Sequence, residues 1–89
     1  MSWKIEYAAS VRKSVRKLDP RVQQRLRVFL EDRLAALDNP RQLGTAMQGA
    51  RYGNLWRYRV GDYRILTRID DERIRILVIR VAHRRDAYR

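Results

Sequence analysis

Two runs in which apolar and mainly basic residues alternate, joined by only two residues, constrain the fold of this chain most. The runs span residues 55–60 and 63–69, with Gly61-Asp62 between them. Side chains along a strand point alternately to opposite faces, and so short a connection predicts a tight antiparallel hairpin. The predicted apolar face holds Trp56, Tyr58, Val60, Tyr63, Ile65, Thr67 and Ile69, and the other face holds Arg57, Arg59, Arg64, Leu66 and Arg68.

The segment before this hairpin contains the signals of one strand and two helices. Alternation over residues 3–7 predicts a short strand, and apolar residues at helical spacing predict a helix over residues 9–18. Asp19 at the N-cap and Pro20 at the first helical position start a second helix, which Asp38-Asn39-Pro40 ends. Helices joined so closely are expected to form an antiparallel hairpin.

The segments that flank the strand hairpin complete the predicted topology. Residues 39–53 are expected to form a loop, and residues 73–82 a strand that is central because residues 76–79 are all apolar. The order is β-α-α-β-β-β. The predicted fold is therefore a single α+β domain over residues 1–89, in two layers. An N-terminal strand and an antiparallel helix hairpin pack on one face of a mainly antiparallel four-stranded sheet.

Composition narrows the classes of function. The 89 residues include 18 arginines and three lysines, and the net charge is +11. This charge favours an acidic partner, nucleic acid first and an acidic protein second. The chain has no cysteine and no His/Asp/Glu cluster with metal-ligand spacing, so no metal is expected. Neither a signal peptide nor a membrane span is evident, which predicts a cytoplasmic protein.

The basic face of the hairpin is the first candidate site. Arg57 and Arg59 lie two apart on one predicted strand and Arg64 lies across the turn, so their side chains are expected to be close. The nearby acids fall in the predicted turns, namely Asp62, Asp70, Asp71 and Glu72. A solvated basic face without a function is the alternative interpretation.

The chain end, His83-Arg84-Arg85-Asp86-Ala87-Tyr88-Arg89, is the second candidate site. His83 follows the predicted central strand, and a neutral imidazole beside Arg84 and Arg85 can accept a proton. Tyr88 can stack on a base or anchor the chain end on the core. Both interpretations of Tyr88 stay open.

These segments resemble the RelE/ParE superfamily of toxins from bacterial toxin–antitoxin pairs. The resemblance covers nearly the whole chain and rests on residues 55–59, on Gly61-Asp62-Tyr63-Arg64-Ile65 and on residues 79–88. It implies the same β-α-α-β-β-β fold. For RelE-like members it implies a ribosome-dependent endoribonuclease without a cofactor. Such an enzyme cuts mRNA in the A site through attack of the ribose 2′-hydroxyl on the adjacent phosphate.

The resemblance also implies roles for individual residues. Arg57 and Arg59 match the pair that holds the scissile phosphate, and Arg64 matches the residue that stabilises the transition state. Arg84 matches the arginine that acts on the leaving group, and Tyr88 matches the tyrosine that stacks on the codon. Contacts with RNA are expected from Arg68, Arg80 and Arg85.

The position of the general base is where this chain departs from the pattern. The best-known members carry lysines where this chain has Arg57 and Arg59, and arginine stays protonated at neutral pH. Either His83 serves as acid or base, or positioning of the phosphate replaces a base, or cleavage is poor. We favour His83.

The resemblance further implies binding partners, and two alternative functions remain open. A cognate antitoxin with an acidic or amphipathic segment is expected to wrap the toxin, and the ribosome and mRNA are its expected targets. A ParE-type inhibitor of DNA gyrase on the same fold is one rival. A non-catalytic basic domain that binds nucleic acid is the other.

Overall fold

The computed structural model describes residues 2–48 and 54–86. The order of its elements confirms the predicted α+β class. In chain order they are β1 (Lys4–Tyr7), α1 (Ala9–Arg16), α2 (Pro20–Arg27), the π-helix η1 (Val28–Leu34), the 3₁₀-helix η2 (Pro40–Leu43), β2 (Thr45–Ala46), β3 (Leu55–Val60), β4 (Tyr63–Asp70) and β5 (Arg75–His83). Among the described residues, no helix is long and apolar enough to cross a membrane.

All five strands belong to one sheet, in the order β1-β5-β4-β3-β2. Strand β1 runs parallel to β5, and the other neighbours are antiparallel. The central position predicted for β5 is confirmed, since β1 and β4 flank it. The prediction of four strands was wrong, because Thr45 and Ala46 pair with β3 and add a fifth. A two-residue strand is too short to show an alternating pattern.

The two helices begin where the sequence predicts and continue differently. The Asp19 side chain accepts a hydrogen bond from the backbone N–H of Arg21 at 2.8 Å, and Pro20 opens α2. The chain then passes from α2 into the π-helix η1, where hydrogen bonds span five residues instead of four. These wider turns help to keep every fourth residue on one buried stripe, made by Leu26, Leu30 and Leu34.

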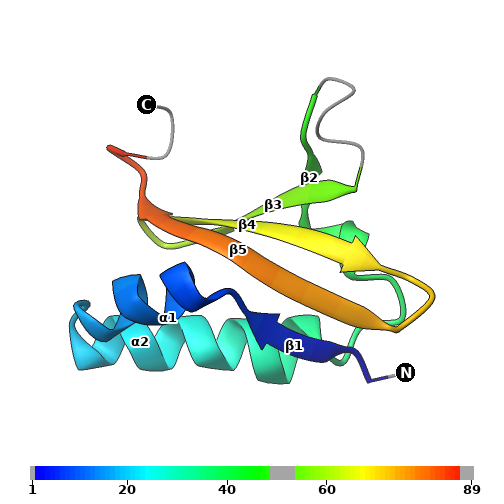
Figure 1. The fold of residues 1–89 in the computed structure, drawn as a ribbon, viewed down its shortest axis with the longest axis horizontal. Coiled ribbons are helices and arrows are strands. Elements are labelled where there is room, and N and C mark those ends of the chain that lie inside the picture. Colours follow the sequence, from blue (N-terminus) through cyan, green and yellow to red (C-terminus); the bar gives the residue numbers. More distant parts are fainter. Residues whose placement is uncertain (1, 49–53, 87–89) are drawn as a thin grey trace.

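The helices cover one face of the sheet only. Figure 1 shows α1 and α2 on one side of the sheet, whereas β2 and residues 84–86, which follow β5, rise on the other side. The helical leucines pack on inward-facing residues of the sheet, including Tyr58, Ile65 and Val78, all buried. The Tyr58 hydroxyl donates a hydrogen bond to the carbonyl of Pro40 at 2.8 Å. The other face of the sheet is therefore left without a covering layer from the described residues.

A β-bulge interrupts the register between β4 and β5. Leu66 pairs with Arg80 but the next residue, Thr67, pairs with Val78, so Ile79 is an extra residue on β5. A shift of one residue moves every following side chain to the other face. Beyond the bulge, Arg80 therefore faces the open side of the sheet, where strict alternation from buried Val78 would have turned it toward the helices.

The ends of five elements differ from the prediction. Strand β1 begins at Lys4 instead of Trp3, and the second helix ends with η1 at Leu34 before it reaches Asp38. Helix α1 ends at Arg16 instead of Leu18, and β5 covers residues 75–83 instead of 73–82. Asp70, predicted in a turn, is the last residue of β4 and pairs in register with Arg75. Element ends carry the weakest sequence signal, since terminal turns and strand ends satisfy backbone groups in several ways.

Candidate nucleic-acid interface

Two rows of side chains cross the open face of the sheet at its β3–β4 turn end, and we call this surface the arginine face. In the first row, Arg59 of β3 lies directly opposite Arg64 of β4. In the second row, Leu66 of β4 lies between Arg57 of β3 and Arg80 of β5. The predicted sharing of one face by Arg57, Arg59 and Arg64 thus follows from the register. Directly opposed like charges repel, so this arrangement favours an anion between them.

The carbonyls of the two-residue turn Gly61-Asp62 accept hydrogen bonds from Arg64 and Arg84. The Arg64 guanidinium donates from Nη1 to the carbonyls of Gly61 and Tyr63, at 3.2 and 3.1 Å. The backbone N–H of Arg84 donates to the carbonyl of Asp62 at 2.7 Å. Its Nε lies 3.8 Å from the exposed Asp62 carboxylate. Arg64 and Arg84, distant in sequence, are therefore brought to one turn, although sequence analysis assigned this turn only a connecting role.

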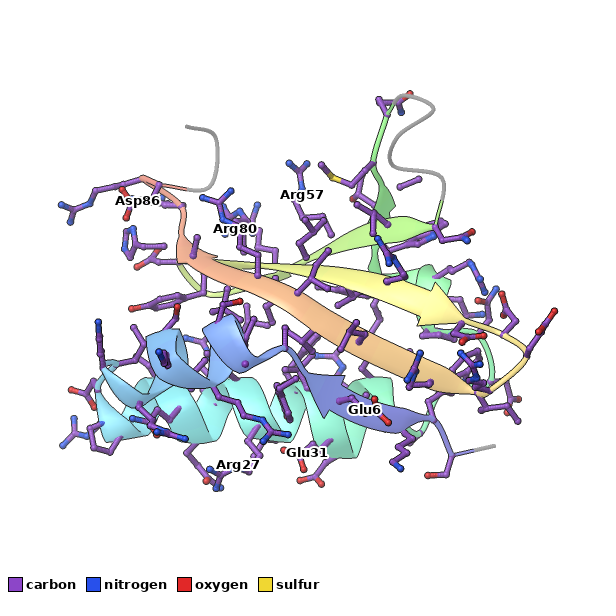
Figure 2. All side chains as sticks on the ribbon, in the orientation of Figure 1. Glu6, Arg27, Glu31, Arg57, Arg80 and Asp86 are labelled. Atoms are coloured by element: carbon purple, nitrogen blue, oxygen red, sulfur yellow. The ribbon has the colours of Figure 1, made fainter. Side chains whose placement is uncertain are left out.

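The second row extends toward the C-terminal segment. Figure 2 shows Arg57 and Arg80 pointing away from the helices, on the side of the sheet where Asp86 also lies. One guanidinium nitrogen of the exposed Arg80 donates to the backbone carbonyl of Asp86 at 3.0 Å. Arg80 is thereby held on the arginine face, beside the position at which the chain leaves the sheet.

The far end of the same face has mixed charge. Arg68 lies opposite Leu55 and Leu77, one row away from an end of the sheet that contains Asp70. At that end Arg75 contacts both Asp70 and Glu6, with N–O distances of 3.6 and 3.1 Å. Arg68, predicted to contact RNA, therefore lies between the arginine face and a region where acids neutralise part of the positive charge.

His83 is not brought to the arginine face. Because the bulge reverses the alternation of β5, His83 pairs with Tyr63 and faces the helix layer. The two rings meet edge to face, with centroids 5.4 Å apart, and His83 borders a hollow together with Ser10 and Ser14 of α1. Its Nδ1 accepts a hydrogen bond from the backbone N–H of Arg85 at 3.2 Å. His83 therefore lies on the opposite face of the sheet from Arg59 and Arg64, and its role as acid or base stays a prediction.

The other predicted site residues lie at or beyond the end of β5. Arg85 is exposed and follows the strand. Tyr88, predicted to stack on a base, lies outside the described residues. Within residues 2–48 and 54–86, no group of three or more His, Asp or Glu side chains is placed to hold a metal ion.

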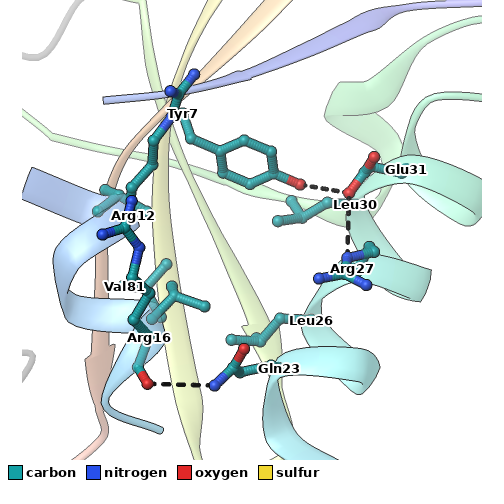
Figure 3. A pocket seen from close by; sticks show the side chains of 11 residues that line it. Tyr7, Arg12, Arg16, Gln23, Leu26, Arg27, Leu30, Glu31 and Val81 are labelled. Carbon is teal, nitrogen blue, oxygen red and sulfur yellow. Dashed lines mark hydrogen bonds and ion pairs between the residues drawn. The ribbon is translucent and has the colours of Figure 1, made fainter. Parts of the chain in front are cut away.

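A second concave surface, the helix groove, lies between α1 and α2 (Figure 3). It has a volume of about 220 Å³. Tyr7 donates a hydrogen bond to Glu31 at 2.8 Å, and Arg27 lies 3.9 Å from the same carboxylate. Burial, and then the bond to Glu31, raise the pKa of Tyr7 well above its usual range. The groove has an apolar floor with a mainly basic rim; its floor includes Val11, Val15, Leu26, Leu30 and Val81, and its rim includes Arg12, Arg16 and Arg27.

Comparison with known proteins shows the family to which the chain belongs. Residues 5–88 match the family described as ParE toxin of type II toxin-antitoxin system, parDE. The chain is 32% identical over 89 residues to Toxin RelG of Mycobacterium tuberculosis, which covers 100% of this chain and 99% of that protein.

Two solved structures share the fold over nearly the whole chain. The toxin–antitoxin complex RelBE2 from Mycobacterium tuberculosis has a TM-score of 0.83 at 28% identity and covers 97% of this chain and 95% of its own. The archaeal RelE–RelB complex from Pyrococcus horikoshii OT3 has a TM-score of 0.77 at 24% identity. The match covers 98% of this chain and 100% of the archaeal chain.

Proposed function

Because the chain belongs to the ParE toxin family, within the RelE/ParE superfamily of type II toxin–antitoxin toxins, we propose that it cleaves mRNA in the ribosomal A site. The observation that carries this proposal is the direct opposition of Arg59 and Arg64 on the arginine face. No acid shares their row among the described residues, and Ala82 of β5 completes it. A phosphate bound between the two guanidinium groups would relieve their repulsion.

The proposed reaction uses the RNA itself as nucleophile. The ribose 2′-hydroxyl attacks the adjacent phosphorus, the bond to the 5′-oxygen of the next nucleotide breaks, and a 2′,3′-cyclic phosphate and a 5′-hydroxyl result. Negative charge grows on the phosphoryl oxygens as this proceeds. Fixed cations aimed at that charge stabilise the transition state more than the ground state.

Each arginine has a proposed role that agrees with its position. Arg57 and Arg59 hold the scissile phosphate from β3, and Arg64, fixed by two carbonyls of the turn, stabilises the transition state. Arg84 stands at the same turn and stabilises the leaving oxygen. Arg80 binds the flanking RNA backbone.

The proposal needs no titrating base from the described part of the arginine face. Arginine stays protonated, and the imidazole of His83 faces the helix layer instead. We therefore assign His83 a positioning role, in which its Nδ1 holds the backbone of Arg85 and with it the turn that presents Arg84. Positioning of the mRNA by the ribosome would supply much of the remaining rate.

The direct test uses programmed ribosomes. A ribosomal target would place the protein in the cytoplasm. Purified protein is added to ribosomes that hold a defined mRNA, and the mRNA ends are mapped by primer extension. We expect cleavage within the A-site codon, and a loss of about 100-fold or more in rate for Arg64→Ala. Arg73→Ala is the matched control, since Arg73 is exposed at the opposite end of the sheet. Binding without any cleavage would favour the non-catalytic basic domain.

Inhibition of DNA gyrase is the second candidate, because the matching family is described by its ParE members. A supercoiling assay with gyrase separates the two functions directly. Inhibition of supercoiling at concentrations that leave mRNA intact on the ribosome would replace the ribonuclease proposal.

A cognate antitoxin is the proposed partner, as in the two toxin–antitoxin complexes of the same fold. The helix groove suits an amphipathic segment whose apolar side chains fill the floor and whose acids meet the basic rim. Co-expression with an acidic protein from the adjoining gene, followed by purification under native salt, tests this partner. A variant with Val15→Asp in the floor of the groove should lose the complex.

A further inference from the structure

A third concave surface, the lateral hollow, lies where the helix layer meets the turn end of β3. It has a volume of about 260 Å³. Its walls come from two layers of the fold, so its shape depends on their packing. The lining residues are Arg25, Val28, Phe29 and Arg33 from the helices and Arg59, Val60 and Gly61 from the sheet.

Three arginines that line the lateral hollow form no ion pair with an acid of the described residues. Among residues 2–48 and 54–86, no ion pair or hydrogen bond is made by the side chains of Arg25, Arg33 or Arg59. Arg41, by contrast, makes a two-point contact with Asp71 at 3.1 and 2.6 Å, and lowers the pKa of that carboxyl. The positive charge of the hollow is therefore left for a partner outside the described chain.

One wall of the lateral hollow lies beside the turn that also binds Arg64 of the arginine face. The Arg25 guanidinium lies so close to Gly61 that a Cβ there would stand 2.7 Å from its Nη1. Gly61 has a φ of +57°. The absence of a side chain therefore lets the helix layer place Arg25 beside the turn whose carbonyl binds Arg64.

We propose that the lateral hollow binds the sugar–phosphate backbone of single-stranded RNA, as a second contact beyond the arginine face. This inference rests on the proposed function for the identity of the nucleic acid. Arg59 belongs to both surfaces, so a strand whose phosphate lies at Arg59 can continue round the edge of β3 to Arg25 and Arg33. Arginine binds phosphate through two parallel hydrogen bonds. Val28, 44% exposed, offers an apolar contact to a ribose or a base.

The test measures the binding of RNA that cannot be cleaved. Fluorescein-labelled 2′-O-methyl RNAs of three and twelve nucleotides are titrated with the full chain by anisotropy, over a series of salt concentrations. Arg25→Ala/Arg33→Ala is compared with Lys13→Ala/Lys17→Ala, which removes the same charge from exposed positions outside the lateral hollow. Circular dichroism and thermal unfolding confirm that all variants fold.

The expected result depends on RNA length. For the twelve-nucleotide RNA, the arginine double variant should bind at least tenfold more weakly than the lysine double variant. Its slope of log K against log salt should be lower by about 1.4, or about 0.7 for each lost phosphate contact. The three-nucleotide RNA, which fits on the arginine face alone, should bind both variants equally.

Three outcomes would overturn the lateral hollow as an RNA site. Equal losses in both double variants would mean that only net charge matters. Unchanged RNA binding, together with a weakened antitoxin complex, would make the hollow a protein-docking surface. If the wild-type chain binds neither RNA but cleaves mRNA on the ribosome, only the RNA site in the hollow is overturned. If it neither binds RNA nor cleaves mRNA on the ribosome, the proposed function fails as well, so the two failures are distinguishable.

Discussion

The opposition of Arg59 and Arg64 predicts that a more stable protein can be made by removing one of them. Arg59→Thr places a good strand former at a directly opposed position and removes one of two like charges. We expect this variant to be more stable than the wild type, although it should cleave mRNA more slowly. The reason is that two directly opposed cations repel each other when no anion lies between them.

The size of the effect follows from the separation of the charges. Guanidinium groups on directly opposed positions can stand about 7 Å apart, and two unit charges at that distance in water repel by about 0.6 kcal/mol. At ionic strength near 0.01 M, where the Debye length is about 30 Å, roughly four fifths of this remains. At 1 M, where it is about 3 Å, roughly a tenth remains. For a domain of this size, about 0.5 kcal/mol corresponds to 2–4 °C in Tm.

Urea unfolding at low and high salt measures this repulsion within a double-mutant cycle. The cycle compares wild type, Arg59→Thr, Arg64→Thr and the double variant, so that the hydrogen bonds lost from Arg64 to the turn carbonyls cancel. Arg68→Thr is the matched control, because Arg68 lies on β4 and on the same face as Arg64 but opposite Leu55. Its free energy of unfolding should change less.

The result that would refute the reasoning is a coupling free energy of zero, or of attractive sign, at low salt. A coupling that does not shrink between 0.01 and 1 M salt would also refute it, since direct charge repulsion must be screened. Either result would mean that the two guanidinium groups point apart and do not share an anion.

Three further predictions concern the scaffold beneath the arginine face. Tyr58→Phe should lower the free energy of unfolding in urea by about 1–3 kcal/mol, because the buried carbonyl of Pro40 loses its hydrogen-bond donor; an unchanged value would contradict this role. Burial raises the pKa of Tyr58 to about 12, against about 10 in an unfolded chain. The neutral phenol therefore contributes stability that is complete below pH 10 and lost as pH rises toward 12. Unfolding followed across this range should show a smaller loss in Tyr58→Phe than in the wild type, because the pKa of Tyr7 is also raised and its contribution remains in both proteins. Gly61→Ala should cost about 1–2 kcal/mol from the positive φ, plus a clash with Arg25 that Arg25→Ala relieves; equal losses in both backgrounds would show that the contact is absent.

The parts of the fold that were predictable are those with a repeated pattern or a local chemical signal. Alternation in residues 55–69 located β3 and β4, and the Asp19-Pro20 pair located the start of α2. The π-helix η1 was not predictable in this way, because its apolar spacing also fits an ordinary α-helix. Strand β2 was missed since two residues show no period, and its pairing with β3 depends on tertiary structure.

The candidate site was predictable on the hairpin and not beyond it. Alternation within a single hairpin correctly grouped Arg57, Arg59 and Arg64, because a two-residue turn fixes the register. The face on which His83 lies depends on the alternation along β5, which one extra residue at Ile79 reverses. Arg25 and Arg33 were not selected, since nothing in the helical sequence indicates that they line one hollow with Arg59 of the sheet.

The bulge at Ile79 decides which side chains of β5 lie on the arginine face. With strict alternation from buried Val78, Arg80 would face the helix layer and His83 would face the open side. A cation would then be buried without a partner, and burial of an unpaired charge is strongly unfavourable. The extra residue instead turns Arg80 outward, puts Val81 against the core and leaves His83 to hold the turn. The same displacement that keeps the histidine off the arginine face therefore adds a fourth arginine to that face, in the row of Arg57 and Leu66. If the proposed cleavage is correct, this surface contributes electrostatic stabilisation and not proton transfer.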